Sequence, residues 1–148
     1  MRLYRDFQEF VAALSSRNVR FLIVGGYAVA AHGHPRYTKD LDIWVWADLQ
    51  NAENVLAALK DFGFGGLDLQ VADFVEPNAV VQIGVEPHRI DLLTSISGVS
   101  FDEAYPNHMM CSIGDITAPF ISLDDLRKNK LATGRLQDLA DAEALRTE

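Results

Sequence analysis

The chain has 148 residues, of which 49% are hydrophobic, and it carries a formal net charge of -8. This composition fits one compact domain over residues 1–148, and it excludes both disorder and indiscriminate binding to nucleic acid, whose backbone is bound mainly through Lys and Arg. A lone cysteine, Cys111, excludes a disulfide framework and a cysteine-based zinc site.

The apolar runs of the chain are short. None approaches the roughly 20 residues that are needed to span a bilayer, and the first residues, MRLYRDF, contain no hydrophobic signal region. We therefore expect a cytoplasmic protein without a membrane partner.

Apolar spacing and turn residues predict the elements of the first half of the chain. Phe7, Phe10, Val11 and Leu14 follow the spacing of an amphipathic helix. Asp48 has the character of a helix N-cap. The expected elements are helices over 4–16, 27–32 and 49–62 and strands over 20–24 and 36–46.

In the second half, short segments rich in Val and Ile predict strands of a mainly antiparallel sheet. Ser122 and Asp125 form the capping box of a helix that Gly134 ends. All the elements together predict an α/β (α+β) fold with a short mixed sheet, helices on one face, an acidic site on the other and a C-terminal helical pair. The expected elements here are strands over 71–75, 80–85, 89–96, 108–113 and 118–121 and helices over 122–132 and 136–145.

Two carboxylates, Asp40 and Asp42, lie on the predicted strand that follows a glycine pair. Because successive side chains of a strand point to opposite faces, both carboxylates share one face, while Leu41, Ile43 and Val45 line the other. At about 7 Å apart the two charges repel by roughly 2 kcal/mol at an effective dielectric of about 20. The pair therefore indicates a bound cation or a basic partner.

A third carboxylate, Asp91, is flanked by core residues in the segment RIDLL, so it faces away from the core as the other two acids do. If the two strands are neighbours, the three acids converge, and two Mg²⁺ ions about 4 Å apart would offset their charge and clamp an in-line phosphoryl displacement. Gly25 and Gly26 end a strand and open a helix, where backbone N–H groups can approach a phosphate. The glycine pair thus predicts a triphosphate cradle.

Four segments carry a resemblance to a known family: GGYAVAAHG, PRYTKDLDIWV, RIDLL and LRKNKLATGRLQDLAD. On these motifs, residues 21–145 resemble a minimal nucleotidyltransferase of the DNA polymerase beta superfamily, nearest to the AbiE-related nucleotidyltransferase group. The order of a Gly-Gly pair, a D-x-D motif and a later Asp is specific, whereas each part alone is weak. The family usually has Gly-Ser and a shorter spacer, while here Gly26 replaces the serine and 13 residues intervene, as in the AbiE-related group.

The resemblance implies a role for each site residue. Gly25 and Gly26 would bind the triphosphate of a nucleoside triphosphate. Three catalytic acids would hold two Mg²⁺ ions, with Mn²⁺ as an alternative, and the last of them would also act as base or orienter for the attacking hydroxyl. These acids are Asp40, Asp42 and Asp91, and the candidates for further phosphate contacts are Lys39, Arg36, Lys130 and Arg135.

The implied reaction moves a nucleoside monophosphate from the triphosphate to an acceptor hydroxyl and releases pyrophosphate. The acceptor stays open between an RNA end, a protein and a small molecule. The alternative is a non-catalytic or regulatory module of the same fold that binds a partner protein in a toxin–antitoxin pair. A third reading is metal-dependent sugar transfer, because D-x-D motifs also hold nucleotide sugars.

Each residue near the acids also has a structural explanation. Asp91 could be a buried acid that pairs with Arg89 or another base. Lys39 and Arg36 could simply neutralise the neighbouring acids. Trp44 shares the parity of the acids, so it could stack on a base, although packing against the C-terminal helices is favoured.

The C-terminal charges have structural explanations as well. Lys130 and Arg135 fit the basic last turn of a helix, where they would favour its dipole. Asp138 and Asp141 could be solvated or could cap nearby N–H groups.

Overall fold

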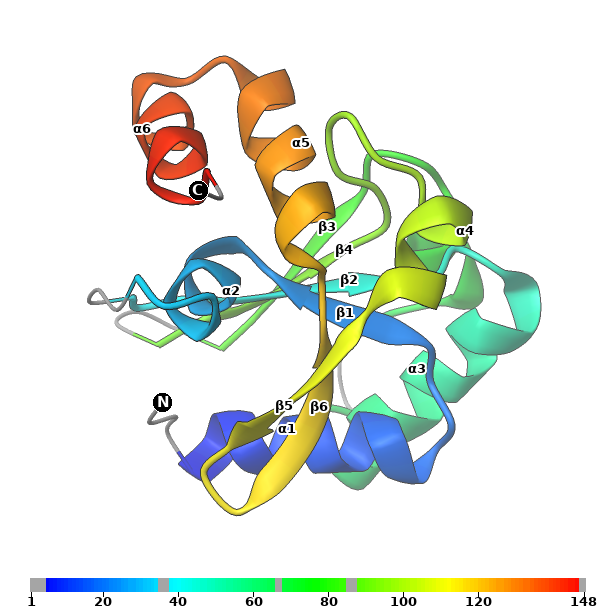
Figure 1. The fold of residues 1–148 in the computed structure, drawn as a ribbon. Helices are drawn as coiled ribbons and strands as arrows, with labels where there is room; N and C mark the ends of the chain where they lie inside the picture. Colours follow the sequence, from blue (N-terminus) through cyan, green and yellow to red (C-terminus); the bar gives the residue numbers. More distant parts are fainter. Residues whose placement is uncertain (1–4, 35–37, 66–67, 85–87, 147–148) are drawn as a thin grey trace.

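The computed structural model describes residues 5–34, 38–65, 68–84 and 88–146. A six-stranded sheet runs through the molecule in the order β3-β4-β2-β1-β6-β5 (Figure 1). Its central strands are the apolar ones, as the sequence pattern requires of a buried strand. The strands are β1 (Phe21–Val24), β2 (Leu41–Val45), β3 (Val80–Ile83), β4 (Ile90–Leu93), β5 (Met109–Ile113) and β6 (Ile116–Phe120).

Helices lie on both sides of this sheet, so the prediction that they cover one face only, opposite the acidic site, is wrong (Figure 1). In Figure 1, α1 and α3 pack on each other below the sheet, while α4, α5 and α6 lie above it. No helix in the described residues combines the length and the apolar character that crossing a membrane requires. The helices are α1 (Arg5–Ser16), α2 (Gly25–Ala31), α3 (Leu49–Asp61), α4 (Phe101–Ala104), α5 (Leu123–Thr133) and α6 (Leu136–Ala144), with the short 3₁₀ turns η1 (Val71–Phe74) and η2 (Tyr105–Asn107).

The sheet is mixed, as the sequence predicts. The strand β1 runs antiparallel to β2 and parallel to β6. The strand β2 also pairs with β4, in parallel, and the hairpins β3–β4 and β5–β6 complete the sheet. The acid-bearing segments are therefore neighbours near its centre.

The helix boundaries follow the predicted caps. Asp48 accepts a hydrogen bond from the backbone N–H of Asn51 at 3.2 Å and so caps α3. Ser122 accepts one from the N–H of Asp125, also at 3.2 Å, and caps α5. Gly134 ends α5 with a φ of 74°, a left-handed conformation that glycine adopts without strain.

The strand predicted over 71–75 is wrong, because this segment forms the turn η1. The Asp73 carboxylate accepts a hydrogen bond from the N–H of Gln70 at 2.7 Å, which closes the turn locally. Phe74 is fully buried and anchors the turn in the core. A local side-chain cap and one buried aromatic ring thus outweigh the strand propensity of the two valines.

The helix α4 lies in a segment where the sequence predicts only a loop, and it explains Trp44. The Trp44 ring is 1% exposed and packs edge-on against Phe101 of α4 at a centroid distance of 5.1 Å. Trp44 therefore contacts α4, and it is too deeply buried to stack on a nucleotide base.

Candidate active site

The glycine pair brings the backbone directly against an acidic side chain. Gly25 has a φ of +68°, and a Cβ atom at this position would overlap the carboxylate of Asp42. A Cβ atom at Gly26 would lie 2.8 Å from two side-chain atoms of Thr38. Larger residues would therefore displace the acid or the segment that leads into β2.

The predicted convergence of acids is confirmed at the level of the backbone. Asp42 on β2 and Asp91 on β4 are direct partners in the parallel pairing, so their side chains point to the same face of the sheet. Asp40 directly precedes β2 and lies on the same face, since it stands two positions before Asp42.

Arg89 joins two of these acids. Its Nε donates to Asp91 Oδ1 at 2.8 Å, and its Nη2 donates to Asp91 Oδ2 at 3.3 Å. The same Nη2 donates to Asp40 Oδ2 at 3.1 Å. The pairing of Asp91 with Arg89 that the sequence left open is therefore present, and it extends to a second acid from the neighbouring strand.

Asp42 is the electrostatically exceptional acid of the group. Burial, together with the negative charges of Asp91 and Asp40, raises its pKa from 3.8 to about 6, although Lys130 and Arg89 act in the opposite direction. Asp42 therefore changes protonation close to neutral pH.

The negative charge of Asp40 is also incompletely neutralised. Its Oδ1 atom is buried, and it has no hydrogen-bond partner in the part of the chain that the structure describes. A buried carboxylate oxygen without a partner is costly unless a cation or water molecule completes it.

Lys130 lies in the last turn of α5, as the sequence predicts, and its side chain is buried there. Its Nζ lies 3.0 Å from Asp138 Oδ1 and 3.3 Å from Asp141 Oδ2. Both aspartates are buried as well, so they are neither solvated nor simple caps. Lys130 thus links α5 to α6 through an internal ion pair with two acids.

Asp138 collects further donors from the same hairpin. Thr133 Oγ1 donates to Asp138 Oδ2 at 2.7 Å, and Arg135 Nε donates to it at 2.6 Å. Burial raises the pKa of Asp138, but the hydrogen bonds from Thr133, Lys130 and Arg135 outweigh this effect and hold it below the usual value of 3.8. This carboxylate is therefore a fixed negative charge that orients the cations of the hairpin.

A cleft of 670 Å³ collects most of the predicted site. The glycine pair, two of the acids and the cations of α5 and α6 meet there, although they come from opposite ends of the chain. Asp91 lies beside Asp42 on the sheet but does not line the cleft, and Arg36 lies outside the described residues. The lining residues are Gly25, Gly26, Thr38, Lys39, Asp40, Asp42, Lys130, Arg135, Gln137 and Asp138.

Sequence analysis missed the bridging role of Arg89 and the contribution of Thr38 and Gln137 to the cleft. The position of Arg89 two residues before Asp91 was an available signal, because side chains at i and i+2 share one face of a strand. Thr38 and Gln137 gave no such signal, since they reach the cleft only through the tertiary fold.

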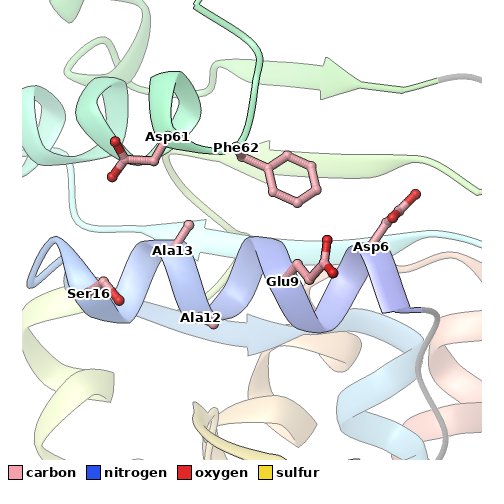
Figure 2. Close-up of a pocket in the computed structure, with 7 residues that line it drawn as sticks. All are labelled: Asp6, Glu9, Ala12, Ala13, Ser16, Asp61 and Phe62. Carbon is pink, nitrogen blue, oxygen red and sulfur yellow. The ribbon is translucent and has the colours of Figure 1, made fainter.

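A second hollow, of 510 Å³, lies between α1 and the end of α3 (Figure 2). Its acids are Asp6, Glu9 and Asp61, which Figure 2 shows on the two helices around the Phe62 ring. Arg17 holds Asp61 with bonds of 2.6 and 2.8 Å, and Arg5 lies 3.0 Å from Glu9. None of these residues belongs to the predicted site.

The donor set of the cleft fits a divalent cation. Carboxylate oxygens are the ligands that Mg²⁺ prefers, and the orphaned Asp40 Oδ1 and the neighbouring Asp42 supply them. Among the described residues, however, no group of three or more His, Cys, Asp or Glu side chains is already arranged to hold a metal ion. Arg89 instead engages Asp91 and one oxygen of Asp40.

Solved structures with the same fold define the class of protein. A proposed nucleotidyltransferase from Thermotoga maritima is similar with a TM-score of 0.61 and 16% identity, covering 96% of this chain and 89% of that one. The lincosamide antibiotic adenylyltransferase LnuA, in a lincomycin-bound structure, is similar with a TM-score of 0.54 and 15% identity, covering 97% and 96%. An antigenic nucleotidyltransferase-like protein from Paracoccidioides brasiliensis has a TM-score of 0.55 and 16% identity over 95% and 74%. The fold is that of the nucleotidyltransferases.

The family follows from the sequence. A family model described as aminoglycoside-2''-adenylyltransferase matches residues 6–108, and the chain belongs to this family. The protein is accordingly a nucleotidyltransferase. A comparison with curated proteins finds no match. The narrower resemblance to the AbiE-related group has no support from these comparisons and stays a prediction.

Proposed function

We propose that the protein transfers AMP from ATP to a hydroxyl group of a small-molecule acceptor, with a divalent cation as cofactor. The observation that carries this proposal is the pairing of Asp42 with Asp91 beside a cleft whose other wall carries Lys130 and Arg135. Acids opposite cations in one cleft suit a metal-bound triphosphate, whose charge both kinds of group must balance. The names of the matching family and of LnuA support adenylyl transfer to a small acceptor.

The reaction forms one bond and breaks one. The acceptor oxygen attacks the α-phosphorus, the bond from this phosphorus to the β-phosphate bridging oxygen breaks, and pyrophosphate leaves with the electron pair. Asp91 is the proposed acceptor of the hydroxyl proton, because it is the strand partner of Asp42, which lines the cleft.

The chain's own residues mainly bind and orient. Gly25 and Gly26 leave room for the triphosphate beside Asp42, and Lys39, Lys130 and Arg135, which also line the cleft, would balance its charge. Asp40, Asp42 and Asp91 would hold Mg²⁺ or Mn²⁺, which would neutralise phosphate charge when bound.

The overall charge favours a cationic acceptor. At a net charge of -8, the protein attracts polycations from solution and repels polyanions such as RNA. An aminoglycoside carries several ammonium groups together with hydroxyl groups, so it meets both requirements. This is why a small cationic acceptor is proposed here ahead of an RNA end or a protein hydroxyl.

The test is a pyrophosphate-release assay with Mg²⁺ and each of ATP, GTP, CTP and UTP, in the presence of aminoglycosides or lincomycin. We expect pyrophosphate release with ATP. Mass spectrometry should then show that the mass of the acceptor has increased by about 329 Da, the mass of an added AMP group. Asp91→Asn is the matched inactive control. No release with any nucleotide and no nucleotide-induced thermal shift would refute the proposal.

A non-catalytic role in a toxin–antitoxin pair is the alternative proposal. The observation in its favour is Arg89, which pairs with Asp91 and with one oxygen of Asp40, as it would in a protein that never binds a metal. Asp42→Ala separates the two functions. Cellular function that survives this substitution would favour the module that acts by protein binding.

A further inference from the structure

The guanidinium of Arg89 lies among the acids that the proposed metal ion would need. It reaches Asp91 on its own strand and Asp40 on the approach to the neighbouring strand, 49 residues away in the sequence. One arginine therefore ties together two of the three carboxylates.

These ion pairs are shielded from water more than an ordinary surface pair. The exposed fractions of the side chains are 25% for Arg89, 13% for Asp91 and 30% for Asp40. For comparison, the Arg17–Asp61 pair on the α1–α3 side has exposed fractions of 47% and 42%. Partial burial reduces screening, so Arg89 competes strongly with any other cation for the same oxygens.

Arg89 does not complete the neutralisation of the site. It donates hydrogen bonds to Asp40 Oδ2 and to both oxygens of Asp91. Asp40 Oδ1 stays buried without a hydrogen-bond partner among the residues that the structure describes. While the Arg89 guanidinium is in place, Asp40 Oδ1 is therefore still able to bind a second cation.

We propose that Arg89 is the resident counter-cation of the acidic site and that a divalent metal ion must displace its guanidinium from Asp40 and Asp91 in order to bind all three acids. This inference rests on the proposed function only in requiring that the acids bind a divalent cation. Displacement also frees the Asp91 oxygens from two hydrogen bonds. The binding of the metal and the availability of Asp91 as a base are therefore coupled through one side chain.

The first test measures the affinity of the nucleotide-free protein for Mn²⁺ alone, by electron paramagnetic resonance of the free ion. Arg89→Gln removes the competing charge and keeps hydrogen-bonding capacity, and we expect it to bind Mn²⁺ on the order of ten-fold more tightly than the parent protein. Arg89→Lys keeps the charge and should give a smaller gain.

Arg17→Gln is the matched control. It removes one positive charge from an Arg–Asp pair of similar geometry on the other side of the sheet, so the change in net charge is the same. We expect its Mn²⁺ affinity to equal that of the parent protein. If Arg89→Gln binds Mn²⁺ with unchanged or weaker affinity, the proposal is overturned, because Arg89 does not then compete with the metal ion. An absence of Mn²⁺ binding in the parent protein would overturn it as well.

A second measurement does not depend on the stability of the variants. In the unaltered protein, titration with Mg²⁺ should shift the NMR signal of the Arg89 Nε–H toward the position of a solvated arginine and leave that of Arg17 in place. An Arg89 signal that does not move while Mg²⁺ binds would refute displacement. Since neither experiment uses nucleotide or acceptor, a failure of nucleotidyl transfer would leave both outcomes readable.

Discussion

Two arginine–aspartate clusters lie on opposite sides of the sheet, and they place the same functional groups in different surroundings. Beside the α1–α3 hollow, Arg17 lowers the pKa of Asp61, mainly through a hydrogen bond between exposed side chains. At the cleft, Arg89 holds Asp40 and Asp91, yet burial raises the pKa of their neighbour Asp42 to about 6.

The difference shows that charge balance is complete in one region and incomplete in the other. Arg17 and Asp61 neutralise each other, whereas in the described part of the chain Arg89 bonds two of the three acids and Asp42 has the more distant charges of Lys130 and Arg89. A cluster that leaves buried negative charge uncompensated reduces the stability of the fold. Such a cluster is typical of a binding site that a cationic ligand completes.

The largest expected effect comes from Asp42→Asn, which removes the central carboxylate and keeps its size. We expect nucleotidyl transfer to fall on the order of a thousand-fold, because this side chain lies between the other acids and the glycine pair. Steady-state kinetics of pyrophosphate release would measure the change. Asp61→Asn is the control, and we expect it to retain the parental rate.

Next in size is the effect of Lys130→Met on stability. Removing the ammonium group leaves Asp138 and Asp141 buried without it, which should lower the free energy of unfolding by about 3–5 kcal/mol. Urea denaturation would measure this loss. Lys128→Met tests whether burial is the cause, since the Lys128 side chain is 67% exposed and lies 4.0 Å from Asp125, so its removal should change little.

A third prediction concerns the pH dependence of stability. Because the pKa of Asp42 is higher in the folded state than in the unfolded chain, its ionisation destabilises the fold as pH rises from 3.8 through 6. Above this range Asp42→Asn should be more stable than the parent protein by about 3 kcal/mol, and the gain should vanish near pH 4. A difference in unfolding free energy that is independent of pH would contradict this prediction.

The smallest effect compares Gly25→Ala with Gly33→Ala. Both glycines have positive φ, but a Cβ atom would overlap Asp42 only at Gly25, while nothing lies within 4 Å of a Cβ at Gly33. We expect Gly25→Ala to cost about 1–3 kcal/mol more than Gly33→Ala in thermal denaturation. Equal losses would show that backbone conformation alone requires the glycine.

The convergence of the acids could be predicted from the sequence, whereas their pairing with Arg89 across the strands could not. Strand alternation places Asp40 and Asp42 on one face and turns Asp91 away from the core, so their convergence follows on the condition that the two strands are neighbours. The bond from Arg89 to Asp40 depends on β4 lying beside β2, which only the strand order establishes.

The same distinction explains the C-terminal hairpin. The caps of α5 are local, so Ser122 and Gly134 could be identified from residue type and position. The burial of Lys130 depends on the packing of α6 against α5, and a charge pattern along one helix does not reveal it. Local signals thus predicted the elements, and the chemistry between elements needed the structure.

The composition of the cleft has a consequence for any shortened form of the chain. The acids and the glycine pair lie within the family match over residues 6–108, while Lys130 and Arg135 come from the helical hairpin that follows it. A fragment that ends at residue 108 would keep the carboxylates and lose both of these cations. The charge of the cleft is thus divided between the family-matched segment and α5 and α6 (Leu123–Ala144).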